Sequence, residues 1–426
     1  MPTPRLTVLV PDLFGGGAGR FASELTIALG KRVALDLALF EDAINYPYDG
    51  SLYVLSEMHS RGLDRLALLR HLGEVTARFF VLRRRSRPDT VLSLTAYANF
   101  VNVLTRARGQ RVVVSSRTNE RIGNPGPMGA IVRGLVRTLY RRADLVTAVS
   151  HGARAELVEH FGVDPERALT LYSALPLERL RAQGSDPLDD DLASIFDRPV
   201  VVSVGRLNPE KGSWPLVRAF AATCAPGARL LILGRGIYAK ELPERARGLG
   251  LSVYAADEPD HPDGPAEACD VVFAGFRARP VRYVARSTVF ALPSRWEGLP
   301  MALLEALAVG AVCVASDCRY GPREILAPDT DWRIETSTPE RVEHGILMPV
   351  PSPGLAPPEA PLDAAERAWA ETLAEVLADE PLRRHYRARA LARSEDFHVD
   401  RLLPAWEEAL FGAPLSGASR TAPRAR

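Results

Sequence analysis

Two glutamates stand eight residues apart after a short apolar run, within the string SRWEGLPMALLEALAVG over residues 294–310. Glu297 lies in the loop after the predicted strand VFALP, and Glu305 lies inside the helix that Pro300 opens. Eight residues is a little over two helical turns, so both carboxylates can face one side. The backbone N–H groups of a helix start form an anion site. The string predicts an anion cradle flanked by two acids, as a phosphorylated sugar requires, although such a pair alone more often marks a capped surface helix.

Two cations stand at another predicted strand end. Arg206 follows the strand VVVSVG, and NPEKGSWPLVRAF brings Lys211 to the start of the next helix. Cations at such a crossing can straddle a diphosphate and add to the dipole of the Glu297–Glu305 helix. Only three of the 53 basic residues are lysines, which favours a specific use of Lys211, because a compact ammonium suits a tight phosphate pocket. The alternative is a surface salt bridge.

Glycine-rich strand ends complete the candidate set. Gly16 and Gly17 end a glycine turn between the first strand, LTVLVPDL, and a helix, where glycine lets backbone approach phosphate. The pattern is not GxGxxG, which argues against a nicotinamide site, and a plain tight turn is the alternative. Gly234 ends the strand LLILG, and Phe276 and Arg277 follow the strand DVVFAG, in a loop that could meet a base edge or simply pack.

Strands and helices alternate along most of the chain, which predicts two doubly wound parallel sheets. We expect an N-terminal domain over residues 1–180, a linker over 181–197 and a second domain over 198–396. The boundary rests on Pro, Gly and Asp clusters, and a further Pro-rich linker covers 351–361. A last helix is predicted over 397–412. The tail, 413–426, lacks apolar residues and is predicted to be disordered.

Composition is that of a globular protein, with 426 residues of which 46% are hydrophobic. No apolar run reaches the length of about 18 residues that a membrane span requires, and the N-terminus lacks a signal-peptide layout. Four cysteines without metal-type spacing indicate packed thiols, and the cytoplasm is the expected compartment.

Charge is unevenly distributed. Residues 1–181 hold 25 Lys and Arg against 17 Asp and Glu, a net of +8, and the remainder holds 28 against 35, a net of −7. The arginines at 83, 84, 85 and 87 follow an amphipathic helix. This pattern favours an anionic partner such as the inner face of the membrane, with solvated Arg-rich helices as the alternative. We expect no nucleic-acid partner.

Several strings together resemble the retaining glycosyltransferases of family 4, which have the GT-B fold. These strings are GRLNPEKG, SRWEGLPMALLEALAVG, SDCRYGPREIL and HGILMPV, and VSHGARAELVEHFGVDPERALTLYSALPLERL resembles the family's crossover region. The GPREIL string is similar to the subgroup that builds cell-surface polysaccharides. The resemblance implies two facing Rossmann-like domains, with the C-terminal helices crossing back onto the first.

The resemblance also implies roles for residues. Arg206 and Lys211 would bind the diphosphate of the donor, and Glu297 would lie beside the hydroxyls of its sugar. The backbone of Gly298, Leu299 and Pro300 would hold sugar or phosphate oxygens, and Glu305 would bind the ribose. From the first domain, the implied donor-binding residues are Gly16, Gly17 and, where the family often has a histidine, Arg117 or Asn119.

The implied activity is retaining, metal-independent transfer of a hexose or N-acetylhexosamine from a UDP- or GDP-sugar to a glycan or polyprenyl-linked acceptor. No Asp-x-Asp stands at a strand end suited to a metal, so we expect the protein cations to serve and no cofactor to be needed. Two alternatives stay open at this point. One is another enzyme on the same fold, a nucleotide-sugar epimerase or a phosphorylase, and the other is a non-catalytic protein that binds sugar nucleotides.

Overall fold

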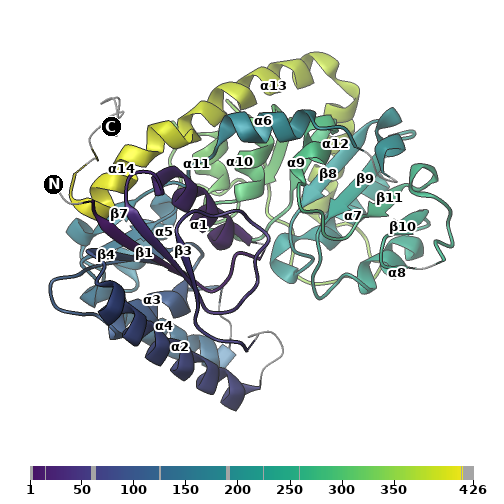
Figure 1. Ribbon diagram of the computed structural model, residues 1–426. Coiled ribbons are helices and arrows are strands. Elements are labelled where there is room, and N and C mark those ends of the chain that lie inside the picture. Colours follow the sequence, from purple (N-terminus) through teal and green to yellow (C-terminus); the bar gives the residue numbers. More distant parts are fainter. Residues whose placement is uncertain are drawn as a thin grey trace. The chain divides into compact units, whose positions relative to one another are not determined.

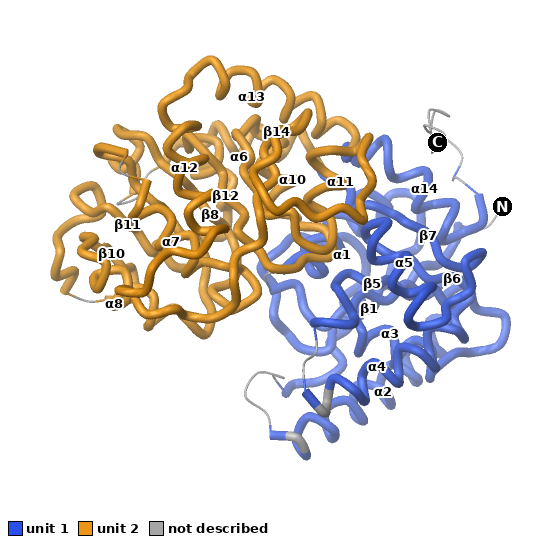
Figure 2. Tube along the Cα trace, turned by 180° about the vertical axis from the view of Figure 1, so that it is seen from behind, with its two compact units in different colours: residues 1–175, 397–426 blue, residues 176–396 orange. Residues whose placement is uncertain are grey.

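The structure is a computed structural model (Figure 1). It describes residues 3–14, 16–58, 64–123, 126–188, 192–223, 225–258, 260–413 and 415. The chain divides into two compact units, shown in different colours in Figure 2. Unit 1 comprises residues 1–175 and 397–426, and unit 2 comprises residues 176–396.

Unit 1 is built on a seven-stranded sheet in the order β3-β2-β1-β4-β5-β6-β7. All of its strand pairs are parallel, as the alternating pattern predicts. The strands are β1 (Arg5–Val10), β2 (Ala34–Leu39), β3 (Ser51–Val54), β4 (Thr90–Leu94), β5 (Arg111–Ser116), β6 (Leu145–Ala148) and β7 (Ala168–Thr170). The helices are α1 (Gly16–Leu29), α2 (Arg65–Ser86), α3 (Ala96–Leu104), α4 (Gly126–Leu139), α5 (His151–Glu159), α14 (Val399–Phe411) and the short 3-10 turns η1 (Tyr140–Arg142) and η2 (Pro165–Arg167).

Helices cover both faces of this sheet. Alternate residues of β1 point to opposite sides, and Val8 packs with α1 and α14 while Leu9 packs with α2 and α3. The ring centroids of Phe21 and Trp406 lie 4.8 Å apart in the first of these layers. Helix α14, in the segment predicted to cross back, therefore belongs to the core of unit 1.

Helix α2 corrects one expectation about charge. Arg83, which the sequence assigned to a membrane-facing cluster, is only 1% exposed. Its Nη1 donates to the carbonyl of Asn102 at 2.8 Å, and its Nε donates to Oε1 of Gln110 at 2.5 Å. The residue falls on the inward face of the helix, beside Phe79, so it serves the interior of unit 1. None of the described helices is long and apolar enough to cross a bilayer.

Unit 2 holds an eight-stranded sheet in the order β10-β11-β9-β8-β12-β13-β15-β14, parallel except for β14. The strands are β8 (Val200–Val204), β9 (Arg229–Leu233), β10 (Val253–Ala255), β11 (Val271–Phe273), β12 (Val289–Leu292), β13 (Cys313–Ser316), β14 (Glu340–Val342) and β15 (Gly345–Met348). The helices are α6 (Leu177–Ser185), α7 (Ser213–Ala222), α8 (Glu241–Gly248), α9 (Val281–Arg286), α10 (Met301–Ala308), α11 (Pro322–Leu326), α12 (Ala364–Ala378), α13 (Glu380–Ser394) and the 3-10 turns η3 (Ala193–Asp197), η4 (Pro209–Lys211), η5 (Ala266–Ala268) and η6 (Glu395–Phe397).

The two segments predicted as linkers are parts of unit 2. Within 181–197, Arg181 of α6 donates to the carbonyl of Ala308 at 3.2 Å and pairs with Glu395 at 2.6 Å. The division between the units falls before α6, at residues 175 and 176, instead of at 180. The 351–361 segment lacks helix and strand, but Trp214 and Arg218 of α7 donate hydrogen bonds to its carbonyls. Pro and Gly clusters indicate irregular backbone. They do not indicate whether side chains of other elements bind that backbone, so they do not distinguish a free linker from a packed loop.

Cys269, Cys313 and Cys318 are buried free thiols, as the spacing predicts. The fourth cysteine, at position 224, lies outside the described residues. So does most of the predicted disordered tail, of which the structure describes residues 413 and 415.

Candidate functional site

The candidate site of unit 2 centres on one ion pair. Lys211, in η4, donates from Nζ to Oε1 of Glu297 at 2.6 Å. The hydroxyl of Ser294, which is fully buried, donates to the same oxygen at 2.6 Å. The Glu297 side chain is 9% exposed and that of Lys211 is 21% exposed. Oε2 of Glu297 accepts no hydrogen bond from the part of the chain that the structure describes, so one oxygen of a fixed carboxylate is available.

Backbone contact brings the two loops together. Gly212 follows Lys211 with a φ of +64°, and a Cβ there would lie 2.0 Å from the carbonyl oxygen of Pro293. Only glycine fits such an approach. The N–H of Arg295 donates to the carbonyl of Glu210 at 2.8 Å, a second backbone contact between the same two loops. The sequence therefore fixes the Lys211 turn against the Glu297 loop through main chain as well as through charge.

The segment 317–326, which contains the GPREIL string, contacts the Glu297 loop. The N–H of Glu297 donates to the carbonyl of Arg319 at 2.7 Å, and the N–H of Tyr320 donates back to the carbonyl of Glu297 at 2.9 Å. Arg323 of α11 is buried and donates to Asp317 at 2.6 Å and to Glu340 at 2.5 Å. A buried arginine with two carboxylate partners is a satisfied charge, so the motif anchors the segment on which Glu297 rests.

The other predicted residues of this loop stand at the start of α10. Gly298, Leu299 and Pro300 lead into the helix, and Pro300 provides no side-chain cap for its first N–H groups. Glu305 is the fifth residue of the helix and is 7% exposed. The prediction of a loop acid and a helix acid on one short element is confirmed.

The second predicted cation, Arg206, pairs with the residue that precedes Lys211 in the chain. The Arg206 side chain is 66% exposed and pairs with Glu210 at 3.2 Å. An exposed pair of this kind is worth little, so the guanidinium can exchange Glu210 for another anion at small cost.

The structure explains Gly234 by packing. A Cβ on Gly234 would lie 1.8 Å from the carbonyl oxygen of Gly205, and its φ is +149°. The close approach inferred from the sequence is therefore to the chain's own backbone after β8. Phe276 is 40% exposed after β11, and Nε of Arg277 donates to the carbonyl of Ala274 at 3.2 Å.

The predicted residues of unit 1 fall near the ends of its strands. Gly16 and Gly17 form the exposed start of α1. Arg117 stacks 3.9 Å from the centroid of the Phe21 ring and donates to Oγ of Ser173 at 2.5 Å. Burial lowers the pKa of Arg117 to about 9. The side-chain oxygen of Asn119 accepts from the N–H of Ile122 at 3.0 Å, which shapes the loop after β5.

Sequence reasoning missed Glu120, the next residue in that loop. It is 1% exposed, and its Oε1 accepts from Ser116 at 3.0 Å and from Tyr140 at 3.2 Å. Burial, with a smaller contribution from Glu156, raises the pKa of Glu120 to about 7. No sequence motif marks the residue, because its environment is assembled from β5, η1 and α5.

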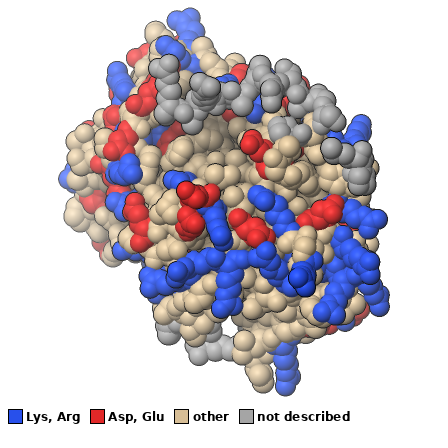
Figure 3. All heavy atoms as spheres, turned by 90° about the vertical axis from the view of Figure 1, so that its left-hand side faces the viewer, with Lys and Arg blue, Asp and Glu red and all other residues tan. Residues whose placement is uncertain are grey.

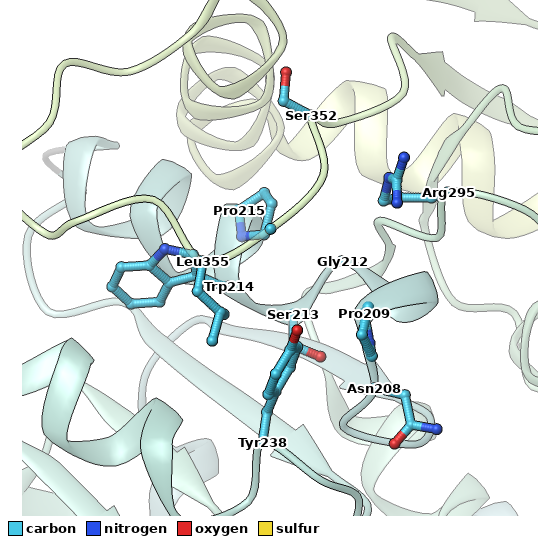
Figure 4. Close-up of a pocket in the computed structure, with 11 residues that line it drawn as sticks. Asn208, Pro209, Gly212, Ser213, Trp214, Pro215, Tyr238, Arg295, Ser352 and Leu355 are labelled. Carbon is cyan, nitrogen blue, oxygen red and sulfur yellow. The ribbon is translucent and has the colours of Figure 1, made fainter. Parts of the chain in front are cut away.

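A small pocket, partly open to solvent, lies beside η4 (Figure 4). The first turn of α7, Tyr238, Arg295 and the loop at 352–355 contribute to its lining. No predicted site residue lines it, although Pro209 and Gly212, on either side of Lys211 in the chain, do. Among the described residues, no group of three or more His, Cys, Asp or Glu side chains could hold a metal ion.

The comparisons with known proteins identify the class. The family model described as Glycosyltransferase Family 4 matches residues 15–179, and the model described as Glycosyl transferases group 1 matches residues 198–349. Together the two matches take in most of both units. The chain belongs to the family 4 glycosyltransferases, as the motifs predict.

Individual relatives and a solved structure agree with this class. The chain is 27% identical over 274 residues to an uncharacterized glycosyltransferase of Methanocaldococcus jannaschii, a match that spans 63% of each chain and so less than two thirds of that relative. It is 25% identical, over 92% of its length and 95% of the relative, to the N-acetylgalactosamine-N,N'-diacetylbacillosaminyl-diphospho-undecaprenol 4-alpha-N-acetylgalactosaminyltransferase of Campylobacter jejuni. The crystal structure of Anabaena HepE in complex with UDP superposes with a TM-score of 0.67 at 19% identity, covering 95% of this chain and 98% of that one. The GT-B fold predicted from the sequence is confirmed.

The raised pKa of Glu120 predicts a pH-dependent stability. The folded state keeps this proton up to about pH 7, whereas an unfolded glutamate loses it near 4.5. The contribution of Glu120 to the free energy of unfolding is therefore complete below about pH 4.5 and is lost as the pH rises toward 7. Glu120→Gln should flatten the fall of the melting temperature between pH 5 and 8, measured by calorimetry.

The control for this measurement is Glu166→Gln, which changes an exposed glutamate of unit 1. It should keep the wild-type slope. An unchanged slope in Glu120→Gln would show that this carboxyl is already ionised in the folded protein.

Proposed function

We propose that this glycosyltransferase moves a hexose or N-acetylhexosamine, with retention, from a UDP- or GDP-sugar to a glycan or polyprenyl-linked acceptor in cell-surface polysaccharide synthesis. The observation that carries the proposal is the Lys211–Glu297 contact of 2.6 Å beside the start of α10. This contact supports the proposal, because a cation suited to a leaving group lies next to a carboxylate suited to sugar hydroxyls. The relative from Campylobacter jejuni, whose name describes transfer to a diphospho-undecaprenol-linked sugar, supports the acceptor class.

Charge development in the reaction suits these residues. Breaking the anomeric C–O bond builds negative charge on the departing diphosphate and positive charge on the sugar ring. Lys211, Arg206 and the uncapped N–H groups at the start of α10 would stabilise the diphosphate. Protein cations would thus take the place of Mg²⁺, and no cofactor is required.

We propose the remaining roles from the family resemblance and from where each residue lies in the chain. Glu297, held through Oε1, would accept sugar hydroxyls at Oε2. Glu305 would bind the ribose, and the backbone of Gly298, Leu299 and Pro300 would hold sugar or phosphate oxygens. Gly234, Phe276 and Arg277 would contact the donor from neighbouring strand ends. Gly16, Gly17, Arg117 and Asn119 are proposed as the donor-binding residues of unit 1.

Retention requires no dedicated protein base in this scheme. The acceptor attacks from the face that the diphosphate leaves, so a leaving-group oxygen can take the acceptor's proton. The carboxylate of Glu297 already accepts from Lys211 and Ser294, and we therefore assign it to substrate binding and to the charge on the ring.

We also propose that the enzyme is cytoplasmic and associates peripherally with an anionic membrane surface. The net charge of +8 over residues 1–181 supports this part of the proposal. A polyprenyl-linked acceptor would be presented at the same surface.

The reaction itself can be tested with UDP-glucose, UDP-N-acetylgalactosamine and GDP-mannose against polyprenyl-diphosphate-linked acceptors in excess EDTA. We expect transfer from one nucleotide class, with the anomeric configuration of the donor kept in the product by NMR. An inverted product, or activity that vanishes in EDTA and returns with Mg²⁺, contradicts the mechanism. Donor conversion without acceptor would indicate an epimerase, and donor binding without turnover would indicate a binding protein.

Three variants separate the proposed roles. Lys211→Ala should lower kcat on the order of 10²–10³-fold, because it removes charge that acts on the leaving group in the transition state. Glu297→Gln should lower kcat with a smaller change in KM. Glu305→Gln should mainly raise the donor KM, since the ribose is bound equally in the ground and transition states.

Glu305→Gln should keep the wild-type melting temperature. Lys211→Ala and Glu297→Gln each leave one member of the largely buried pair without its charged partner, so they should lower it, and calorimetry confirms that both are folded at the assay temperature. Near-normal kcat in both Lys211→Ala and Glu297→Gln would show that the assigned site is wrong.

A further inference from the structure

The outward face of α2 carries an exposed apolar row. Leu66, Leu69, Phe80 and Val81 are 60%, 67%, 39% and 46% exposed. Along the same side of the 22-residue helix, Gly73 and Ala77 continue the row at three- and four-residue spacing. An apolar row of this length on a surface helix commonly marks a site of interaction.

The core of unit 1 does not use this face. Val75 and Phe79, on the opposite side of α2, are fully buried in the layer that packs on the sheet. Arg83 also points inward, to Asn102 and Gln110. One side of α2 therefore packs on the core of unit 1, and an apolar side is exposed to solvent.

Arginines flank the row. Helix α2 contains six arginines and one glutamate, and the guanidinium of Arg84 lies 4.3 Å from the centroid of the Phe80 ring. Within the described parts of the chain, Arg70 and Arg85 make no ion pair, whereas Glu74 is paired with Arg78 at 2.7 Å. Figure 3 shows Lys and Arg side chains gathered in a band across the lower half of the view.

We propose that the outward face of α2 docks on an anionic lipid bilayer. The arginines would lie at the level of the lipid phosphates, and the apolar row would enter the boundary between headgroups and acyl chains. This inference rests on the proposed peripheral association and assigns it to named residues. It keeps Arg84 and Arg85 of the predicted cluster at 83–87 and removes Arg83, which is interior.

Charge favours a bilayer over a second copy of the chain. A two-fold interface through α2 would set the same arginine-flanked face against itself, with Glu74 as the helix's one acidic partner. Like charges in such an interface oppose association. Anionic lipid headgroups offer the complementary charge at every position along the helix.

The test is co-sedimentation of the full chain with vesicles of neutral phosphatidylcholine and with vesicles that also contain phosphatidylglycerol. Wild type should partition onto the anionic vesicles at low salt and much less onto the neutral ones. The charge variant Arg84→Glu/Arg85→Glu and the apolar variant Leu69→Asp/Phe80→Asp should each weaken partition at least tenfold. Circular dichroism melting confirms that each variant is folded.

Matched controls come from unit 2. Arg384→Glu/Arg387→Glu reverses two exposed charges on α13, and Ile237→Asp changes an apolar residue that is 73% exposed. Both controls should partition like wild type. Equal losses in these controls, or wild-type partition in both α2 variants, would overturn the proposal. So would light scattering that shows a dimer broken by the α2 changes.

Transfer to a water-soluble acceptor analogue, measured without vesicles, separates this inference from the proposed function. The α2 variants should keep the wild-type rate in that assay. If the wild type transfers sugar but does not bind anionic vesicles, the surface assignment fails alone. If it binds vesicles through α2 but transfers nothing, the proposed reaction fails alone.

Discussion

The Lys211–Glu297 ion pair is the interaction on which the candidate site of unit 2 depends. Two largely buried charges lie 2.6 Å apart, and neither could remain there unpaired without a large desolvation cost. The pair joins η4 to the loop after β12, and the glycine at 212 lets their backbones meet. The buried Ser294 hydroxyl and the Arg323-centred anchor hold the carboxylate partner in place.

The pair also makes the site ready for a donor. Lys211 and Arg206 each pair with a glutamate, at 2.6 and 3.2 Å, so both cations are held in position by the protein's own carboxylates. A diphosphate would compete with these carboxylates for the cations, and Arg206, being exposed, would exchange more easily. Groups already held in position cost little reorganisation at the moment of reaction.

Much of this arrangement could be predicted from the sequence, because the relevant rules are local or topological. Strand and helix alternation predicts parallel sheets, and the carboxyl ends of parallel strands meet at one edge. That rule places Lys211 and Glu297, 86 residues apart, in the same region. It does not predict their direct contact.

The remainder depends on tertiary packing. Arg83 has the same local sequence as its exposed neighbours, and only the docking of α2 makes it interior. The raised pKa of Glu120 comes from burial among three elements. Glycine is required at 234 because the carbonyl oxygen of Gly205, at the end of another strand, leaves no room for a Cβ. The Pro-rich composition of 351–361 predicts a linker, and it does not show that Trp214 and Arg218 donate hydrogen bonds to the carbonyls of this segment.

The central claim is that Lys211 binds the diphosphate and Glu297 binds the sugar. Calorimetric titration with UDP and GDP, which lack the sugar, in excess EDTA tests this most directly. We expect Lys211→Met to weaken binding of the preferred nucleotide at least tenfold. Glu297→Gln should bind it as tightly as wild type or more tightly, because Lys211 loses a competing partner. Unchanged binding in Lys211→Met, or an equal loss in Glu297→Gln, would show that these roles are wrongly assigned.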